Sequence, residues 1–199
     1  MKALRAPALA ALGLVAFLLF WEAMPRFGLI NPAFLPPPST IPAAFLNEIR
    51  LGVWGEAVLS SLSHYLVGLA VGAGAGIALG VLVGMFRGFE ALTAWVVRLL
   101  RPIPGLAWVP FAIIWFGVQP SAAVFIIAIG VFWIVFFATQ GAVRGVDRDL
   151  IEVAQAFGFR GPLARLTKIL LPAATPGILV GLRTALGQAW MAVVAAEIF

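Results

Sequence analysis

The chain has 199 residues, of which 63% are hydrophobic and 11% are charged, and it carries a formal net charge of +5. Soluble proteins contain about 25% charged residues, so this composition excludes an ordinary soluble domain and indicates several membrane spans. The basic residues are scattered between long apolar runs instead of gathered on one face. This distribution argues against nucleic-acid binding and favours a role in membrane topology.

We expect an all-α polytopic membrane protein with about five spans. The first apolar run lacks a signal-peptide cleavage site, and we interpret it as an uncleaved helix. The third run is interrupted by prolines, so its first part, 91–100, is either an interfacial stub or half of one kinked span. In chain order the candidate spans are 8–24, 57–86, 91–118, 122–139 and 173–199.

The sequence divides into two parts. Residues 1–55 comprise the first span, a proline-rich loop over 25–41 and a short amphipathic helix over 43–53, which we expect to lie along the membrane surface. Residues 56–199 form the core of the protein, and within it 144–172 is the only long polar stretch. Pro172 and Pro176 fit the first turn of a final helix, where a missing backbone N–H is tolerated.

The loop cations predict the orientation of the chain. If the spans alternate, eight cations lie on the side of the N-terminus and two, Arg26 and Arg50, on the other side. The positive-inside rule then makes the first side cytoplasmic, so the N-terminus is inside and the last helix ends near the outer surface. The eight are Lys2, Arg5, Arg87, Arg144, Arg148, Arg160, Arg165 and Lys168.

Glycines recur every fourth residue along the second span. This spacing places them on a slowly winding ridge that a second helix can approach closely, as a static contact or as a moving one. The run is not a dinucleotide-binding fingerprint, because Ile77 stands where the third glycine would be and no strand precedes it. The helix-packing glycines are Gly68, Gly72, Gly76, Gly80 and Gly84.

Two further polar positions lie within predicted spans. An isolated arginine near the bilayer centre costs at least about 2.5 to 3.5 kcal/mol, so Arg183 should face protein or a water-filled cavity. It forms either a structural ion pair or, with Gln188 and Trp190, part of an anion pathway. His64 either forms a hydrogen bond between helices or contacts a substrate or proton.

Catalytic chemistry has little support in this sequence. There is no cysteine and a single histidine, and we find no convergent acid and base pair, no metal-ligand cluster and no P-loop. We therefore expect no enzyme, no catalytic residue, no metal and no cofactor bound by this chain.

The polar stretch carries the most specific motif. It contains Glu152-Val153-Ala154-Gln155-Ala156-Phe157-Gly158 and, later, Ile169-Leu170-Leu171-Pro172. This pattern resembles the EAA loop of permease subunits of bacterial ABC importers, although Val153 replaces the first alanine and the stretch around Gly161 is one residue longer. The outer run Leu35-Pro36-Pro37-Pro38-Ser39 and the segment Gly181-Leu182-Arg183-Thr184-Ala185 resemble the branch that imports nitrate, sulfonates and taurine.

The resemblance implies a type I ABC importer transmembrane domain in the bacterial inner membrane, with a final span missing from this chain. It implies a permease subunit for a small solute, an organic or inorganic anion such as sulfonate, taurine or nitrate. It also implies coupling to a separate ATPase, which binds the ATP and Mg. The implied coupling residues are Glu152, Ala154, Ala156, Gly158, Gly161 and Pro172.

The same resemblance implies a set of partners. These are cytoplasmic ABC ATPase subunits, a periplasmic or extracellular substrate-binding protein, a second permease copy in a homodimer, and membrane lipid, with no nucleic acid. The alternative is an ion-driven secondary transporter, which needs an intramembrane carboxylate as ion carrier. Only Glu22 and Glu197 qualify, both near span ends.

Overall fold

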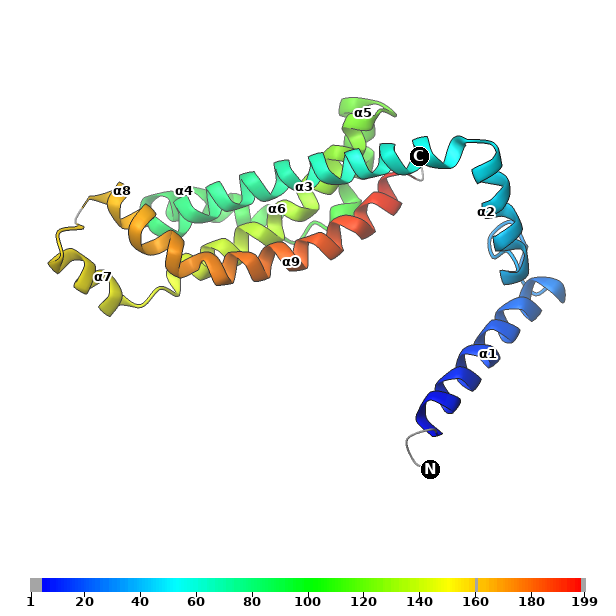
Figure 1. Cartoon of the computed structure of the whole chain (residues 1–199). Helices are drawn as coiled ribbons and strands as arrows, with labels where there is room; N and C mark the ends of the chain where they lie inside the picture. The colour runs from blue at the N-terminus through cyan, green and yellow to red at the C-terminus, as the bar shows by residue number, and fades with distance from the viewer. Residues whose placement is uncertain (1–4, 160, 198–199) are drawn as a thin grey trace. The chain divides into compact units, whose positions relative to one another are not determined.

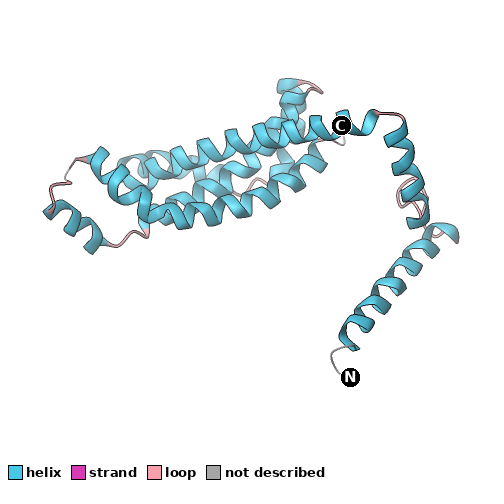
Figure 2. Cartoon of the chain, in the orientation of Figure 1, coloured by secondary structure: helices cyan, strands magenta, loops and turns pink. Residues whose placement is uncertain are grey.

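The computed structural model describes residues 5–159 and 161–197, and every regular element within them is a helix (Figure 2). Four helices are long and apolar enough to cross a membrane, or five if the bent pair Arg87–Leu100 and Gly105–Phe116 forms one span. The expectation of an all-helical protein with about five spans is confirmed. The four are Pro7–Arg26, Val53–Met85, Pro120–Arg144 and Pro162–Ala196.

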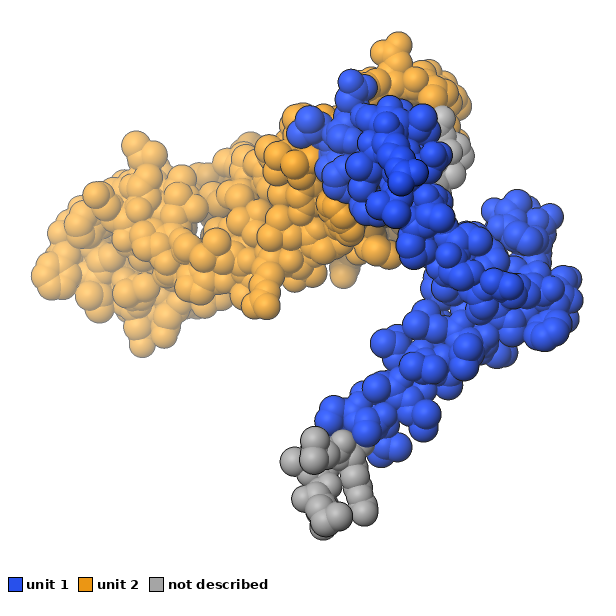
Figure 3. All heavy atoms as spheres, turned by 45° about the vertical axis from the view of Figure 1, so that its right-hand side comes forward, with its two compact units in different colours: residues 1–59 blue, residues 60–199 orange. Residues whose placement is uncertain are grey.

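The chain divides into two compact units, residues 1–59 and 60–199 (Figure 3). The division falls inside helix α3 (Val53–Met85), a few residues after the predicted boundary between 55 and 56. Helix α3 continues across this boundary. We describe each unit by itself.

Unit 1 contains α1 (Arg5–Arg26), the short turn η1 (Pro38–Thr40) and α2 (Ile41–Arg50). The carboxylate of Glu22, near the end of α1, accepts hydrogen bonds from the backbone N–H and the hydroxyl of Ser39, at 3.0 and 2.7 Å. The Arg26 Nε lies 2.5 Å from the same carboxylate. This polar cluster holds the end of the proline-rich loop against the end of α1.

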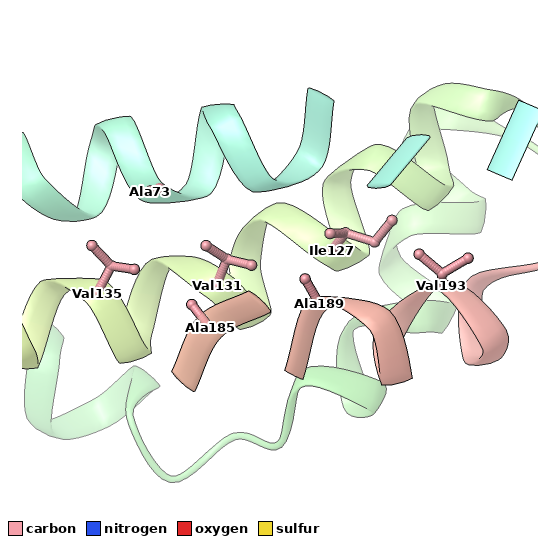
Figure 4. Packing of buried hydrophobic residues seen from close by; sticks show 7 residues of the cluster. All are labelled: Ala73, Ile127, Val131, Val135, Ala185, Ala189 and Val193. Atoms are coloured by element: carbon pink, nitrogen blue, oxygen red, sulfur yellow. The ribbon is translucent and has the colours of Figure 1, made fainter. Parts of the chain in front are cut away.

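Unit 2 is built around α6 (Pro120–Arg144), which lies between α3 and α9 (Leu171–Ala196) (Figure 1). Figure 4 shows Ile127, Val131 and Val135 of α6 between the ribbon of α3 and that of α9. These three side chains are at most 3% exposed. The core is therefore a three-helix contact in which the central helix supplies the large side chains and its two neighbours supply small ones.

The glycine ridge of α3 lies along α6 at a constant register. A Cβ atom on Gly68 would lie 2.7 Å from Ile127 Cβ, and one on Gly84 would lie 3.0 Å from Val143 Cβ. Both pairs are 59 positions apart, so α3 and α6 run parallel. At Gly72 the carbonyl oxygen of Ala128 occupies the space that a Cβ would need. The structure thus places the ridge in direct backbone contact with its neighbour.

Helix α9 packs against a neighbouring side of α6 in the reverse direction and also contacts α3. Gly181 lies against Ala138 and Gly177 against Ala142, so the residue numbers fall on one helix as they rise on the other. A Cβ on Gly177 would approach the Ala142 Cβ to 2.7 Å. Small residues on both helices allow this close antiparallel crossing.

The segment between α3 and α6 returns along the length of α6. It comprises α4 (Arg87–Leu100), the turn η2 (Gly105–Trp108) and α5 (Val109–Phe116), with an 88° bend between α4 and the η2–α5 part. Because α3 and α6 are parallel, this segment must lead from the end of one to the start of the other. An 88° bend fits a broken span and a re-entrant loop alike, so both interpretations of 91–100 stay predictions.

The last helix begins earlier than the sequence analysis expects. Helix α8 (Pro162–Arg165) continues through the π-helical turn η3 (Leu166–Leu170) into α9, which itself begins at Leu171. Pro172 lies in the first turn of α9, as expected, whereas Pro176 lies inside that helix. Pro172 cannot donate to the Lys168 carbonyl, and a proline ring clashes with that carbonyl in a regular α-helix. The wider π turn immediately before Pro172 relieves the clash and keeps the helix continuous.

Candidate functional site

The predicted coupling residues lie on and beside a short helix at one end of unit 2. This helix, α7 (Arg148–Ala156), follows α6 after three residues, and Figure 1 shows it with α8 beyond the end of the α3–α6–α9 bundle. Asp147 caps its N-terminus by accepting the backbone N–H of Asp149 at 3.0 Å. The carboxylate of Asp149 in the first turn also favours the helix, because it faces the positive end of the helix dipole.

Gly158 ends α7 in a defined geometry. Its φ is +91°, a left-handed conformation that glycine adopts far more easily than residues with a side chain. The N–H of Gly158 donates to the Gln155 carbonyl at 3.1 Å, and the N–H of Phe159 donates to the Ala154 carbonyl at 3.0 Å. These two bonds form a Schellman motif, so the glycine of the loop pattern is the residue that stops the helix.

The other coupling candidates occupy distinct positions in the same region. Glu152 and Ala156 are exposed and Ala154 is half-buried on α7. Gly161 is the N-cap of α8 and precedes Pro162, which supplies the favoured first helical residue. Pro172 lies at the start of α9, beyond the π turn.

An apolar groove of about 340 Å³ separates α7 from the start of α9. Leu150, Val153 and Phe157 project from one face of α7, and their exposed fractions are 47%, 54% and 79%. Exposed apolar side chains on a helix outside the membrane bundle indicate a surface that another protein covers. The full lining is Leu150, Val153, Ala154, Phe157, Phe159, Lys168, Ile169, Pro172 and Ala173.

The three pathway candidates on α9 are exposed, but only Arg183 and Trp190 lie on one face of the helix. Arg183, Gln188 and Trp190 are exposed, whereas Gly181, Ala185 and Ala189 of the same helix are buried against α6. Within residues 5–159 and 161–197, no hydrogen bond or ion pair to Arg183 is present. The indole of Trp190 forms an edge-to-face contact with Tyr65, with ring centroids 5.7 Å apart.

His64 lies at the other end of the bundle from α7. Its Nδ1 is 3.0 Å from Glu197 Oε1, and the hydroxyl of Ser61 donates to Glu197 Oε2 at 2.5 Å. The His64 side chain is 14% exposed. The structure thus places His64 in a polar contact that joins α3 to the end of α9, and it does not bring His64 together with the coupling residues.

Sequence reasoning missed an ion pair at the α7 end of the bundle. Glu90 of α4 lies 2.6 Å from the Arg144 guanidinium at the end of α6, and the same guanidinium donates to the Val83 carbonyl at 3.3 Å. The sequence contained an indication of this ion pair, because Glu90 and Arg144 flank spans that are predicted to end on the same side of the membrane. Across the described part of the chain, no group of three histidines or carboxylates is arranged to hold a metal ion.

Comparisons with known proteins identify relatives of this chain. The family described as "Binding-protein-dependent transport system inner membrane component" matches residues 72–199. The protein named "Putative aliphatic sulfonates transport permease protein SsuC" of Bacillus subtilis is 35% identical over 89% of this chain and 64% of its own length.

Two further relatives are named for other substrates. The bicarbonate transport system permease protein CmpB of Synechocystis is 33% identical over 94% of this chain and 69% of its own length. The taurine transport system permease protein TauC of Escherichia coli is 30% identical over 94% of this chain and 70% of its own length. The chain thus spans about two thirds of the length of these relatives.

Proposed function

The chain belongs to the binding-protein-dependent inner membrane components, the permeases of ABC importers, and from this premise we propose that it forms the translocation pathway for a small anion and is coupled to a separate ATPase through α7. The observation that carries the coupling proposal is the exposed apolar face of α7. This face contains Leu150, Val153 and Phe157 on a short helix connected closely to α6 and α8.

A short helix held at both ends can transmit force. Only three residues separate α6 from α7, and the Schellman motif at Gly158 fixes the direction in which the chain leaves α7. When a partner moves the helix, the motion therefore passes to α6 and, through α8 and η3, to α9. In this proposal ATP and Mg bind to the partner ATPase, and Glu152, on the opposite face of α7 from the apolar side chains, forms a polar contact with it.

The remaining assembly follows the topology proposed from the cations. The N-terminus and α7 lie on the cytoplasmic side, where ATPase subunits bind, and a substrate-binding protein docks on the outer side. A second permease copy completes the pathway in a homodimer within the bacterial inner membrane. Arg183, Gln188 and Trp190 are exposed on α9. The exposure of Arg183 supports this arrangement, because an arginine in a span needs a polar or protein environment.

The cargo class that we propose is a small oxyanion-bearing solute. The relatives are named for aliphatic sulfonates, bicarbonate and taurine, all of which contain a sulfonate or carbonate-type group. Arg183 is the one cation within α9, and its guanidinium can bind such a group through two parallel hydrogen bonds. We therefore propose Arg183 as a pathway residue.

The contacts of two carboxylates weigh against an ion-driven transporter. Glu22 is held by Arg26 and Ser39, and Glu197 is held by Ser61 and His64. A carboxylate that carries an ion must exchange that ion with water during each transport cycle. Hydrogen bonds and ion pairs within the protein compete with this exchange. Uptake that persists without any ATPase would reverse this preference.

Two substitutions test the coupling proposal. We expect Glu152→Lys and Gly158→Asp to abolish uptake of a labelled sulfonate while the protein remains in the membrane, because one reverses a charge at the contact and the other distorts the end of α7. The matched controls are Glu48→Lys on α2 and Gly88→Asp on α4, where a Cβ meets no atom within 4 Å. Normal uptake in both α7 variants would overturn the proposal.

A further inference from the structure

A second cavity, which we call the basic cavity, lies on the opposite side of α7 from the apolar groove. Its volume is about 420 Å³, within the range of small-ligand pockets. Four arginines and one glutamate line it, together with apolar residues of α3, α6 and α7. The charged lining residues are Arg87, Glu90, Arg144, Arg148 and Arg165.

Among the described residues, three of the four arginines have no acidic partner for their guanidinium groups. Arg144 is paired with Glu90 at 2.6 Å, whereas no ion pair or hydrogen bond within 5–159 and 161–197 engages the guanidinium of Arg87, Arg148 or Arg165. The Nε of Arg165 is buried and has no hydrogen-bond partner among these residues. Buried donors are almost always satisfied in proteins, so this atom indicates a missing acceptor.

The three free guanidinium groups come from three different elements. Arg87 begins α4, Arg148 begins α7 and Arg165 ends α8, so the fold brings them together from distant parts of the sequence. Like charges that share one cavity repel one another, and an anion between them removes that repulsion. The neighbouring acidic residues do not supply this anion, because Glu90 pairs with Arg144, Asp147 caps α7, and no ion pair joins Asp149 to these arginines within the described residues.

The cavity lies where the apolar spans end. Met85 at the end of α3 and Arg144 at the end of α6 both line it, and the adjoining spans are apolar over more than 18 residues. This depth is that of the lipid headgroups, and basic pockets between membrane helices are suited to phosphate groups at this level.

We propose that the basic cavity is a binding site for a phosphate group, held by the guanidinium groups of Arg87, Arg148 and Arg165. The phosphate comes from an anionic phospholipid headgroup or from free phosphate in the adjoining water. Because Arg148 belongs to α7, occupancy of the cavity fixes α7 against α4 and the end of α6. This site is additional to the proposed transport function, and its test measures binding in the absence of transport.

The experiment uses the full chain in neutral detergent. Binding of a short-chain phosphatidylglycerol is followed by native mass spectrometry, with phosphatidylcholine as the zwitterionic reference. Inorganic phosphate is titrated separately while the thermal unfolding midpoint is recorded, with chloride at equal ionic strength as reference. We compare the wild type with Arg148→Gln/Arg165→Gln, Arg148→Lys/Arg165→Lys and the control Arg50→Gln on α2, whose guanidinium does not line the cavity.

We expect the glutamine variant to bind phosphatidylglycerol about tenfold more weakly or worse, because two charge-assisted hydrogen bonds are lost. The lysine variant should retain part of the affinity, and Arg50→Gln should match the wild type. A preference for phosphatidylglycerol over phosphatidylcholine without a phosphate-specific shift of the unfolding midpoint identifies the lipid source. A phosphate-specific shift without that lipid preference identifies the free anion. Either result supports the site when the glutamine variant loses it.

The proposal is overturned if the wild type prefers neither phosphatidylglycerol over phosphatidylcholine nor phosphate over chloride. It is also overturned if the glutamine variant, folded by circular dichroism, binds as tightly as the wild type. If that variant does not fold, the single substitution Arg87→Gln at the exposed start of α4 replaces it and is judged by the same criteria.

Discussion

The α3–α6–α9 contact and the α7–α8 connection use small residues and glycine for opposite purposes. Along α6, glycines of α3 and α9 remove side chains so that backbones touch, and the side chains of Ile127, Val131 and Val135 are almost fully buried. In the α7–α8 connection, Gly158 ends a helix and leaves large apolar side chains exposed. The first region is filled by contacts within the chain, whereas the second leaves apolar side chains exposed, which a partner covers in the coupling proposal.

This difference teaches where a substitution should affect folding and where it should affect function. A change in the α6 contact acts on the stability of the isolated chain, since its neighbours are already in place. A change on the exposed face of α7 acts on binding of a partner, since little of the chain touches it. The following predictions test this separation, from the largest expected effect on stability to the smallest.

Gly72→Ala should produce the largest loss of stability. The added methyl group would overlap the Ala128 carbonyl oxygen and lie 2.9 Å from Val131 Cβ, so the two helices must separate. Overpacking of this kind costs about 1 to 3 kcal/mol or more. Thermal unfolding in detergent measures the effect. Gly74→Ala is the matched control, because its methyl group meets no atom within 4 Å and helix propensity favours alanine. Equal stability of the two variants would refute the backbone contact.

Gly158→Ala should lower the stability of α7 by about 1 to 2 kcal/mol, because alanine is strained at a φ of +91°. Gly161→Ala is the control, since its φ of −74° suits any residue. Hydrogen exchange at the backbone of α7 reports the effect locally. Faster exchange in both variants alike would show that the left-handed geometry is not what matters.

His64 and Glu197 should show a coupling energy of about 0.5 to 1.5 kcal/mol, as expected for a partly exposed hydrogen bond. The measurement is a double-mutant cycle with His64→Ala and Glu197→Ala, read out by thermal unfolding. The bond joins α3 to the end of α9, so each single variant should loosen that end of the bundle. Strict additivity of the two changes would contradict the contact.

Leu150→Ala combined with Val153→Ala should change stability by no more than about 0.5 kcal/mol, because both side chains are largely exposed. The same variant should lose the co-purifying ATPase in a pull-down from native membranes. Leu92→Ala on α4, a 69% exposed leucine outside the groove, is the control. An undiminished ATPase yield would remove the apolar face of α7 from the coupling proposal.

Much of the fold followed from local patterns in the sequence. The apolar runs predicted the spans, because a helix that crosses a bilayer must be apolar over its full length. The four-residue glycine period predicted a close helix contact, but only the structure shows that α6 is the partner and that it runs parallel. Pro172 was placed correctly in the first turn of α9, but the sequence did not show that α8 and the π turn η3 continue into that helix or that Pro176 lies inside it.

The candidate site also combines features that the sequence predicted with features that only the tertiary structure shows. Amino-acid types and spacing identified the motif from Glu152 to Gly158, whereas the structure showed that it forms α7 and that Gly158 ends this helix in a left-handed conformation. The meeting of Arg87, Arg148 and Arg165 in one cavity, and of His64 with Glu197, was decided by tertiary structure alone. Such groups are distant in sequence, and their proximity depends on the packing of α3, α6 and α9, which no local period specifies.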